Sequence, residues 1–318
     1  MARIVVIGAG VMGTAFTLPA SDRGHEIRLV GTHLDRHLID AMKAERKHPR
    51  LRSTIGVNVT PYQDSEIDAA MAGEIDLVVY GVATAGVDYA TDQIAPRLKG
   101  PTPIVLLSKG VTDAGDRIGI LPDAVVKGLK RHGAPASPVG AIGGPCIAGE
   151  LAVRRDTAAA LGFADVALAE HWVAALSTPY YQLRPTTDLI GLELCAAFKN
   201  FYAIGVGIAQ GRMDAGAPAE NGAFMHNAAA SLFAQVLPEL EAIVAAHGGE
   251  RAAVYGLPGV GDLYVTCQAG RNSRLGRALG AGHSYQTAMD GPLKDETVEG
   301  AQVAQTVAPV MARLAAVG

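Results

Sequence analysis

The chain has 318 residues, of which 49% are hydrophobic and 18% charged, and its formal net charge is -4. This length and apolar content suit two packed domains and exclude a long disordered chain. There is no dense run of lysine and arginine and few aromatic residues, so we expect no nucleic-acid binding. The three cysteines, Cys146, Cys195 and Cys267, show neither metal-ligand spacing nor a disulfide framework, which favours a cytoplasmic protein without a metal. Charges are expected to interrupt the apolar stretches below bilayer length, so we expect no stable membrane insertion.

The chain opens with a short strand that leads directly into a glycine-rich turn. Arg3–Ile7 is rich in β-branched residues, and Gly8, Gly10 and Gly13 follow before a helix and a second strand at Glu26–Val30. This order predicts a dinucleotide-binding turn, in which Gly8 permits the tight turn and Gly10 lets the backbone approach a pyrophosphate. Gly13 would let the helix and the strand pack closely. The pyrophosphate would bind the amides at the helix N-terminus.

The end of the second strand normally indicates which cofactor is bound. An acidic residue there would bind the ribose 2′-hydroxyl and repel a 2′-phosphate, but no carboxylate stands at this strand end. Thr32, His33 and Arg36 could accommodate a 2′-phosphate, whereas Asp35 could turn back towards the ribose. The segment therefore favours NADPH slightly over NADH.

The strand, loop and helix pattern then repeats, which predicts an α/β fold with a Rossmann-type, doubly wound, mainly parallel sheet. In such sheets ligands bind beyond the carboxyl ends of the strands. Lys109 and the loop Gly143–Cys146 follow strand ends, so both are candidates to line one crevice, although a loop lysine is more often only solvated. The later strands are predicted at Ile75–Tyr80, Ile104–Leu107, Val139–Ile142, Thr157–Phe163 and Tyr180–Leu183.

The alternation stops at residue 187, so we expect a dinucleotide-binding domain at residues 1–187 and an all-helical domain at 188–318. The second domain opens with a long helix at Asp188–Gln210 that is apolar on nearly every face, which is typical of a buried element. Lys199 lies near its middle, and a buried lysine needs a partner or a chemical role. Its neighbours on the helix face are all small, which favours the floor of a substrate pocket over helix packing: Gly191, Cys195, Ala203 and Gly207. A further helix is expected at Gly222–Ala246.

A second polar segment follows at Gly256–Gly276. Pro258 and two glycines force a loop before Asp262, and Arg271 and Asn272 stand beside a further glycine. Such an arginine and asparagine could bind a phosphate through charge-assisted hydrogen bonds. An ordinary turn with a solvated arginine is an equally good interpretation of these residues alone.

With these residues assembled, the whole sequence resembles the NAD(P)-dependent sn-glycerol-3-phosphate dehydrogenase family. The resemblance rests on the order and spacing of several motifs: GAGVMGTA at Gly8–Ala15, HPRL at His48–Leu51, SKG at Ser108–Gly110, GGPCIAGE at Gly143–Glu150, FKN at Phe198–Asn200, GDLYVTCQAGRN at Gly261–Asn272 and VEG at Val298–Gly300.

The resemblance implies an enzyme that interconverts dihydroxyacetone phosphate and glycerol 3-phosphate with NAD(P)H and feeds glycerophospholipid synthesis. It implies Lys199 as the acid/base, with Lys109, Asp262 and Asn200 as further catalytic residues. The implied substrate-binding residues are Lys109, Gly144, Cys146, Thr266, Arg271 and Asn272. The implied cofactor-binding residues are Gly8, Gly10, Val11, Met12, Gly13, Thr32, Lys109, Ala148, Arg271 and Glu299.

Two alternatives remain open from the sequence. The chain could be a dehydrogenase of the same fold that acts on another small polyol phosphate or hydroxy acid, although Arg271, Asn272 and Lys109 favour a phosphorylated substrate. It could also be a nucleotide-binding module without activity, but Lys199 and Asp262 are both present. The apolar helical half makes a homodimer the expected assembly.

Overall fold

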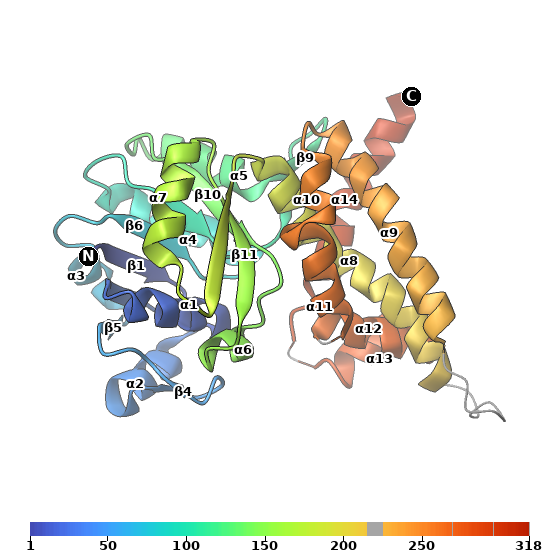
Figure 1. Cartoon of the computed structure of the whole chain (residues 1–318), viewed down its shortest axis with the longest axis horizontal. Coiled ribbons are helices and arrows are strands. Elements are labelled where there is room, and N and C mark those ends of the chain that lie inside the picture. Colours follow the sequence, from blue (N-terminus) through green and yellow to red (C-terminus); the bar gives the residue numbers. More distant parts are fainter. Residues whose placement is uncertain (215–224, 269, 295, 318) are drawn as a thin grey trace. The chain divides into compact units, whose positions relative to one another are not determined.

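The computed structural model describes residues 1–214, 225–268, 270–294 and 296–317 (Figure 1). It divides into two compact units. The first comprises Met1–Lys109 and Leu121–Leu189, and the second comprises Gly110–Ile120 and Ile190–Gly318.

The first unit is built on a mainly parallel sheet of the Rossmann type, as predicted. Its strands lie in the order β12-β11-β10-β7-β6-β1-β2-β5, and the one antiparallel pairing joins β10 to β11. β11 and β12 are parallel to each other, so both run against the other six strands. The strands are β1 (Arg3–Ile7), β2 (Glu26–Val30), β5 (Val59–Tyr62), β6 (Leu77–Tyr80), β7 (Ile104–Leu106), β10 (Val139–Gly143), β11 (Thr157–Gly162) and β12 (Tyr181–Thr186).

Two strand features of this unit were not predicted. β5 contains Pro61, which weakens a strand pattern but is tolerated at a sheet edge. A small antiparallel pair, β3 (Lys47–His48) and β4 (Ser53–Thr54), carries the HPRL motif at the end of β3 and in the turn that follows. Strands of two residues give no readable periodicity, which is why the sequence did not reveal them.

Helices pack on both faces of the sheet, so its strands are buried on both sides and read as continuous apolar runs. A large hydrophobic core cluster includes Val6, Phe16, Leu151 and Trp172. Tyr80 is buried next to α4 (Val87–Ile94), where its hydroxyl donates to Thr91 Oγ1 at 3.2 Å. The helices are α1 (Val11–Asp22), α2 (Arg36–Glu45), α3 (Ile67–Ala70), α4 (Val87–Ile94), α5 (Leu121–Arg131), α6 (Ala148–Ala152) and α7 (Val166–Leu176).

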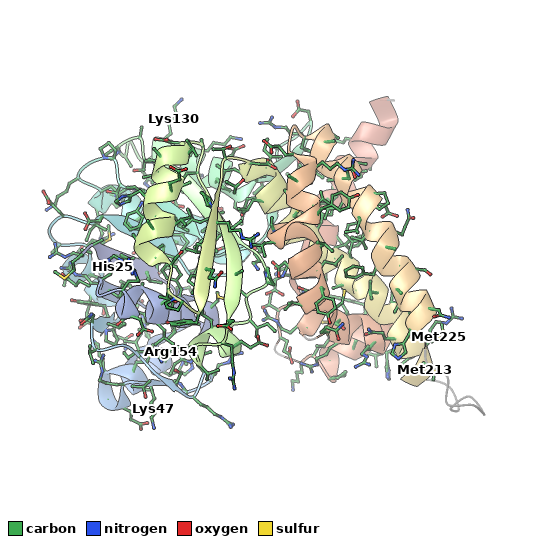
Figure 2. All side chains as sticks on the ribbon, viewed as in Figure 1. His25, Lys47, Lys130, Arg154, Met213 and Met225 are labelled. Atoms are coloured by element: carbon green, nitrogen blue, oxygen red, sulfur yellow. The ribbon has the colours of Figure 1, made fainter. Side chains whose placement is uncertain are left out.

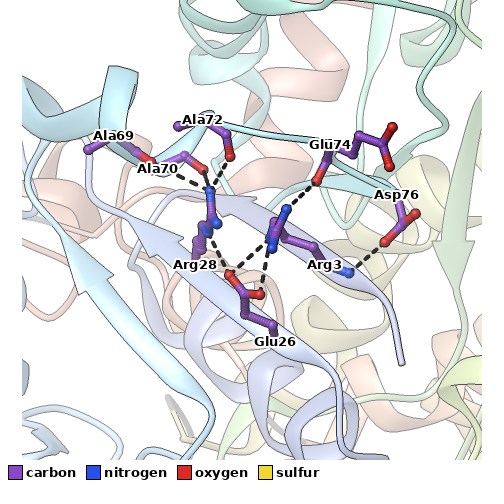
Figure 3. Close-up of polar contacts among 8 residues, drawn as sticks. All are labelled: Arg3, Glu26, Arg28, Ala69, Ala70, Ala72, Glu74 and Asp76. Carbon is purple, nitrogen blue, oxygen red and sulfur yellow. Dashed lines mark hydrogen bonds and ion pairs between the residues drawn. The ribbon is translucent and has the colours of Figure 1, made fainter.

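A polar network joins the amino ends of β1 and β2 (Figure 3). Arg3 Nε donates to both oxygens of Glu26 at 3.0 Å, and Arg28 Nε donates to Glu26 Oε1 at 2.9 Å. The two arginines also donate to backbone carbonyls, Arg3 to that of Glu74 and Arg28 to those at the end of α3. Burial alone would raise the pKa of Glu26, but the hydrogen bonds from Arg28 and Arg3 together lower it below 4.5.

Helices make up residues 190–317 of the second unit wherever the structure assigns regular elements, as predicted. They are α8 (Leu189–Asp214), α9 (His226–Ala246), α10 (Arg251–Tyr255), α11 (Asp262–Gln268), α12 (Arg271–Gly280), α13 (Tyr285–Asp290) and α14 (Glu299–Val317), with a π-helical turn at Leu257–Gly261. Residues 222–224 of the predicted second helix lie outside the described residues.

A hairpin from the middle of the chain also belongs to the second unit, and the sequence did not reveal it. Its strands are β8 (Val111–Asp113) and β9 (Ile118–Ile120). Arg313 of α14 donates to the Gly115 carbonyl at 3.0 Å and to Asp113 Oδ1 at 2.5 Å. The Ile118 N–H donates to His247 Nε2 at 3.2 Å. These contacts attach the hairpin to α14 and to His247 at the C-terminal end of α9.

The expectation that charges interrupt every apolar stretch is wrong for two helices. Leu189–Met213 and His226–Ala246 are both long and apolar enough to cross a membrane by length and composition. Of the most apolar window, 67% is buried in the first helix and 22% in the second. Within the first of these helices, α8, the buried Lys199 forms an ion pair with Asp262.

The stripe of small residues on α8 packs against backbone, so the pocket-floor hypothesis is wrong for its two glycines. A Cβ on Gly207 would lie 2.6 Å from the Ser273 carbonyl oxygen, and one on Gly276 would lie 2.1 Å from that of Ile204. At the other end of α8, a Cβ on Gly249 would lie 2.8 Å from the Gly191 amide nitrogen. Glycines therefore let α8 and α12 approach backbone to backbone.

Glu26→Gln should lower the free energy of unfolding by about 1 kcal/mol at pH 7, because one partly exposed carboxylate loses its charge beside two arginines. The lowered pKa means that Glu26 stabilises the fold above its unfolded value of 4.5 and loses this effect as the pH falls through the folded value. Urea unfolding at pH 7 and near pH 3 measures both. A difference that does not shrink in acid would contradict this assignment.

Gly207→Ala should lower the free energy of unfolding by about 1–3 kcal/mol, because the methyl group meets the backbone of α12. Gly205→Ala is the matched control in the same helix, since no atom lies within 4 Å of its added Cβ. That variant should gain about 0.5–1 kcal/mol from helix propensity. Denaturant unfolding of both decides the matter, and equal effects would show that α8 and α12 are not in close contact.

Candidate functional site

The three glycines after β1 differ in what surrounds them. Gly8 has a φ of 105°, and a Cβ there would lie 2.8 Å from the Gly81 carbonyl carbon. A Cβ on Gly13 would lie 2.2 Å from the Gly8 oxygen, whereas no atom lies within 4 Å of one on Gly10. Gly8 and Gly13 are therefore needed for packing within the turn, and Gly10 leaves open space in front of the backbone.

The N-terminus of α1 is suited to an anion. Its N-cap is Gly10, whose position carries no side-chain cap, and its first turn holds no acidic residue. The first amides of a helix lack intrahelical partners and carry a partial positive charge, so a phosphate fits them. Val11 and Met12 in this turn are half-buried. The residues present thus fit the pyrophosphate of a dinucleotide.

Two side chains hold the peptide groups of Ala9 inside this turn. The Ala9 N–H donates to Asp35 Oδ2 at 3.2 Å, and His48 Nε2 lies 3.1 Å from the Ala9 carbonyl oxygen. Asp35 Oδ2 also accepts from the amide and hydroxyl of Thr32, at 2.9 and 2.8 Å. Asp35 therefore links the glycine turn to the end of β2. His48 belongs to the HPRL motif, but the sequence pattern predicts no role for it.

Arg36, a candidate for a 2′-phosphate, is already paired. Its guanidinium donates to both oxygens of Asp64, at 3.0 and 2.9 Å. Thr32 is buried and its hydroxyl is bound to Asp35. Neither Arg36 nor Thr32 therefore indicates whether the cofactor carries a 2′-phosphate.

Further along the sheet edge, Lys109 and the loop after β10 come together, as the strand ends suggested. Lys109 Nζ donates to the Gly144 carbonyl at 3.4 Å. Gly144 has a φ of 145°, and a Cβ there would lie 2.9 Å from Ala159 Cα, so this position requires glycine. Cys146 is half-buried, and Ala148 begins α6.

The second unit holds Lys199 in a buried polar cluster. Lys199 is 6% exposed and Asp262 is 1% exposed. Lys199 Nζ lies 2.6 Å from Asp262 Oδ1 and 2.9 Å from Thr266 Oγ1. The Thr266 hydroxyl donates its own proton to the Asp262 carbonyl, so its oxygen accepts from Lys199. Lys199 Nζ is thus the donor in both contacts, as an ammonium would be.

A π-helical turn sets the position of Asp262. Leu257–Gly261 forms this turn immediately before α11, and a Cβ on Gly259 would lie 2.0 Å from the Val254 carbonyl oxygen. Such turns often occur at functional sites.

Burial raises the pKa of the neighbouring Cys267 to about 12, although Lys199 opposes the shift. The Cys267 thiol is therefore protonated at neutral pH and is no nucleophile.

Next to Lys199, a buried pair of asparagines joins three helices. Asn272 Nδ2 donates to Asn200 Oδ1 at 2.9 Å, and the Gly300 N–H donates to Asn272 Oδ1 at 2.8 Å. A Cβ on Gly300 would lie 2.4 Å from the Asn200 carbonyl oxygen. These bonds fix α8, α12 and α14 beside one another.

Arg271 stands at the first position of α12. Its N-cap, Gly270, has a φ of 125° and makes no side-chain cap, and no acidic residue lies in the first turn. The Arg271 guanidinium forms an ion pair with Glu299 at the start of α14, and its side chain is 42% exposed. A helix N-terminus without a side-chain cap, beside an arginine, is suited to a phosphate.

The structure thus groups most predicted residues within each unit. In the first unit the glycine turn includes Val11 and Met12, Thr32 joins it through Asp35, and Lys109 meets Gly144. In the second, Lys199 meets Asp262 and Thr266, and Arg271 meets Glu299. Within the described part of the chain, no three His, Cys, Asp or Glu residues are arranged to hold a metal ion.

Comparison with known proteins gives the family of both halves. A model described as the NAD-dependent glycerol-3-phosphate dehydrogenase N-terminus matches residues 3–169, and the corresponding C-terminus model matches residues 188–316. The chain is 33% identical over 288 residues to an NADP(+)-dependent glycerol-3-phosphate dehydrogenase of Archaeoglobus fulgidus, covering 90% of this chain and 82% of that protein.

Two further relatives agree. A glycerol-3-phosphate dehydrogenase [NAD(P)+] of Aromatoleum aromaticum is 33% identical over 314 residues, covering 98% of this chain and 88% of that protein. The crystal structure of glycerol-3-phosphate dehydrogenase from Coxiella burnetii is 27% identical, with a TM-score of 0.84 over 99% of this chain and 90% of that one. The chain belongs to the NAD-dependent glycerol-3-phosphate dehydrogenase family.

Proposed function

We propose that this protein reduces dihydroxyacetone phosphate to sn-glycerol 3-phosphate, reversibly, by hydride transfer from NAD(P)H, and so supplies glycerophospholipid synthesis. The relatives are named for glycerol-3-phosphate dehydrogenase activity with NAD(P)+. The observation that carries the proposal is the buried Lys199 between Asp262 and Thr266. A charged lysine at so low an exposure needs a reason, and proton transfer supplies one.

Lys199 would act as the acid in ketone reduction. Hydride arriving at the carbonyl carbon places negative charge on its oxygen, and a nearby ammonium stabilises that charge and then delivers a proton. Asp262 keeps Lys199 charged before the reaction because its carboxylate lies 2.6 Å from Nζ. In the reverse direction neutral Lys199 would take the proton of the alcohol. Asn200, Lys109 and Asp262 are the further catalytic residues in this proposal.

Arg271 would bind the substrate phosphate at the N-terminus of α12, with Asn272 behind it. Binding a group remote from the reacting carbon fixes the orientation of that carbon. The Asn272 side chain is tied to Asn200 and Gly300, so it also couples the phosphate-binding turn to α8. Thr266, Gly144, Cys146 and Lys109 complete the proposed substrate residues.

The cofactor would be held by the first unit. The glycine turn and the first amides of α1 would take its pyrophosphate, and Thr32 with Asp35 lies at the end of β2 where the adenosine ribose binds in this fold. The nicotinamide ring supplies the hydride when bound. Ala148, Lys109, Arg271 and Glu299 are the further proposed cofactor contacts. We expect both NADH and NADPH to serve, with a slight preference for NADPH, because the Archaeoglobus fulgidus relative is named as NADP(+)-dependent.

The division into a dinucleotide-binding domain at residues 1–187 and a helical domain at 188–318 is part of this proposal, although the structure groups Gly110–Ile120 with the second unit. The two family models support it, since they match residues 3–169 and 188–316.

A homodimer in the cytoplasm is also proposed. Its support is the apolar surface of α9, where Leu232 is 43% exposed. If the molecular mass measured in solution is that of one chain, the proposed dimer is wrong.

Lys199→Met should lower kcat for dihydroxyacetone phosphate about 10²- to 10⁴-fold, because the acid is removed while the apolar stem is kept. NADH or NADPH oxidation measures it. Lys294→Met removes an exposed lysine of the same unit and should leave the rate unchanged. Full activity of Lys199→Met would remove this residue from the chemistry.

Arg271→Ala should raise KM for dihydroxyacetone phosphate more than tenfold while changing kcat less, because a charge-assisted bond to the phosphate is lost. Arg274→Ala is the matched control, since Arg274 lies on the same helix and pairs with Glu296 at 2.7 Å in a similar ion pair. Initial rates at varied substrate separate the two. Equal KM values for both variants would place the phosphate elsewhere.

A further inference from the structure

His48 is completely buried, and both of its ring nitrogens contact backbone. The Leu51 N–H donates to Nδ1 at 3.1 Å, so Nδ1 carries no proton. Nε2 lies 3.1 Å from the Ala9 carbonyl oxygen and must therefore be the protonated nitrogen that donates to it. Burial lowers the pKa of His48 below its ordinary value, which keeps the ring neutral at pH 7.

The Ala9 carbonyl that His48 holds belongs to the peptide that ends in the Gly10 amide. No peptide bond in the described residues is cis, and in a trans peptide the N–H points opposite to the C=O. The carbonyl points inward, towards His48 and the Thr14 hydroxyl, which donates to it at 3.2 Å. The Gly10 N–H must then point the opposite way, and the space next to Gly10 is open, since no atom lies within 4 Å of a Cβ built there.

The preceding peptide is fixed as well. Its N–H, that of Ala9, donates to Asp35, and its carbonyl, that of Gly8, lies against Gly13. Asp35 and Gly13 therefore prevent this peptide from turning over, and His48 does the same for the next one. An isolated glycine turn would sample several orientations because glycine has few steric limits.

We propose that His48 is a positioning residue for the dinucleotide: it holds the Ala9 peptide so that the Gly10 amide faces the cofactor pyrophosphate. The role rests on the proposed function, since it requires a dinucleotide at this turn. His48 itself need not touch the cofactor. It is the last residue of β3 and the first of the His-Pro-Arg-Leu motif.

His25 offers an unusually close control. It is also buried, its Nδ1 accepts from the Ala2 N–H at 3.0 Å, and its Nε2 lies 2.9 Å from the Ala175 carbonyl oxygen. It makes the same two kinds of bond, but at the amino ends of the strands rather than at the glycine turn. Figure 2 labels His25 and Lys47, the chain neighbour of His48, at separate places on the first unit.

The test is the dissociation constant of the full-length protein for NADH and for NADPH, measured by nucleotide fluorescence without substrate. His48→Leu should raise it about tenfold or more and leave KM for dihydroxyacetone phosphate within about twofold. His48→Gln places an amide donor near the position of Nε2 and should restore binding to within about threefold. His48→Asn keeps a group near Nδ1 only and should bind as weakly as His48→Leu. If His48→Leu does not fold, the contrast between Gln and Asn decides.

His25→Leu should melt at a lower temperature than the wild type yet bind both nucleotides with unchanged affinity. Wild-type affinity in His48→Leu or His48→Asn would overturn the positioning role. Equal losses of affinity in the His25 and His48 variants would also overturn it, because they would reflect stability alone. If the wild type binds neither nucleotide, the proposed function itself fails, and this outcome is distinct from both others.

Discussion

The second unit is arranged around a buried ion pair between Lys199 and Asp262. Both side chains are almost completely buried, and taking two charges out of water costs several kcal/mol per ion unless geometry and hydrogen bonds offset it. Here the Thr266 hydroxyl oxygen is a further acceptor for Lys199, and the same hydroxyl donates to the Asp262 backbone carbonyl. A cluster of this kind is weak evidence for stability and stronger evidence for chemistry.

Much of the second unit serves to keep that cluster in place. Glycines let the backbones of α8 and α12 come close together, and the pair Asn200–Asn272 joins these helices at the residue next to Lys199. The π-helical turn before Asp262 sets the start of α11. The first unit applies the same principle to its glycine turn, where Asp35 and His48 fix the two peptide groups of Ala9. In both cases backbone packing and buried polar bonds restrict one functional group to one orientation.

The sequence predicted what depends on local pattern. β1, the glycine turn and β2 follow from β-branched runs and glycine spacing, and α8 follows from its apolar length. It did not predict the hairpin β8–β9 or the edge strand β5, since the strands of that hairpin have three residues each and β5 contains a proline. Whether small residues line a pocket or a helix contact depends on the neighbouring backbone, and here α12 covers Gly207 while Gly249 covers Gly191. The contact between His48 and Ala9 spans 39 residues, so no local pattern could show it.

The central claim is that this chain reduces a phosphorylated ketone with a nicotinamide cofactor. It is tested most directly by supplying the wild-type protein with NADH or NADPH and comparing dihydroxyacetone phosphate with unphosphorylated dihydroxyacetone. The account predicts cofactor oxidation with the phosphorylated compound, formation of sn-glycerol 3-phosphate, and a kcat/KM lower by orders of magnitude without the phosphate. Absence of turnover with both cofactors, or equal rates with the two ketones, would contradict it.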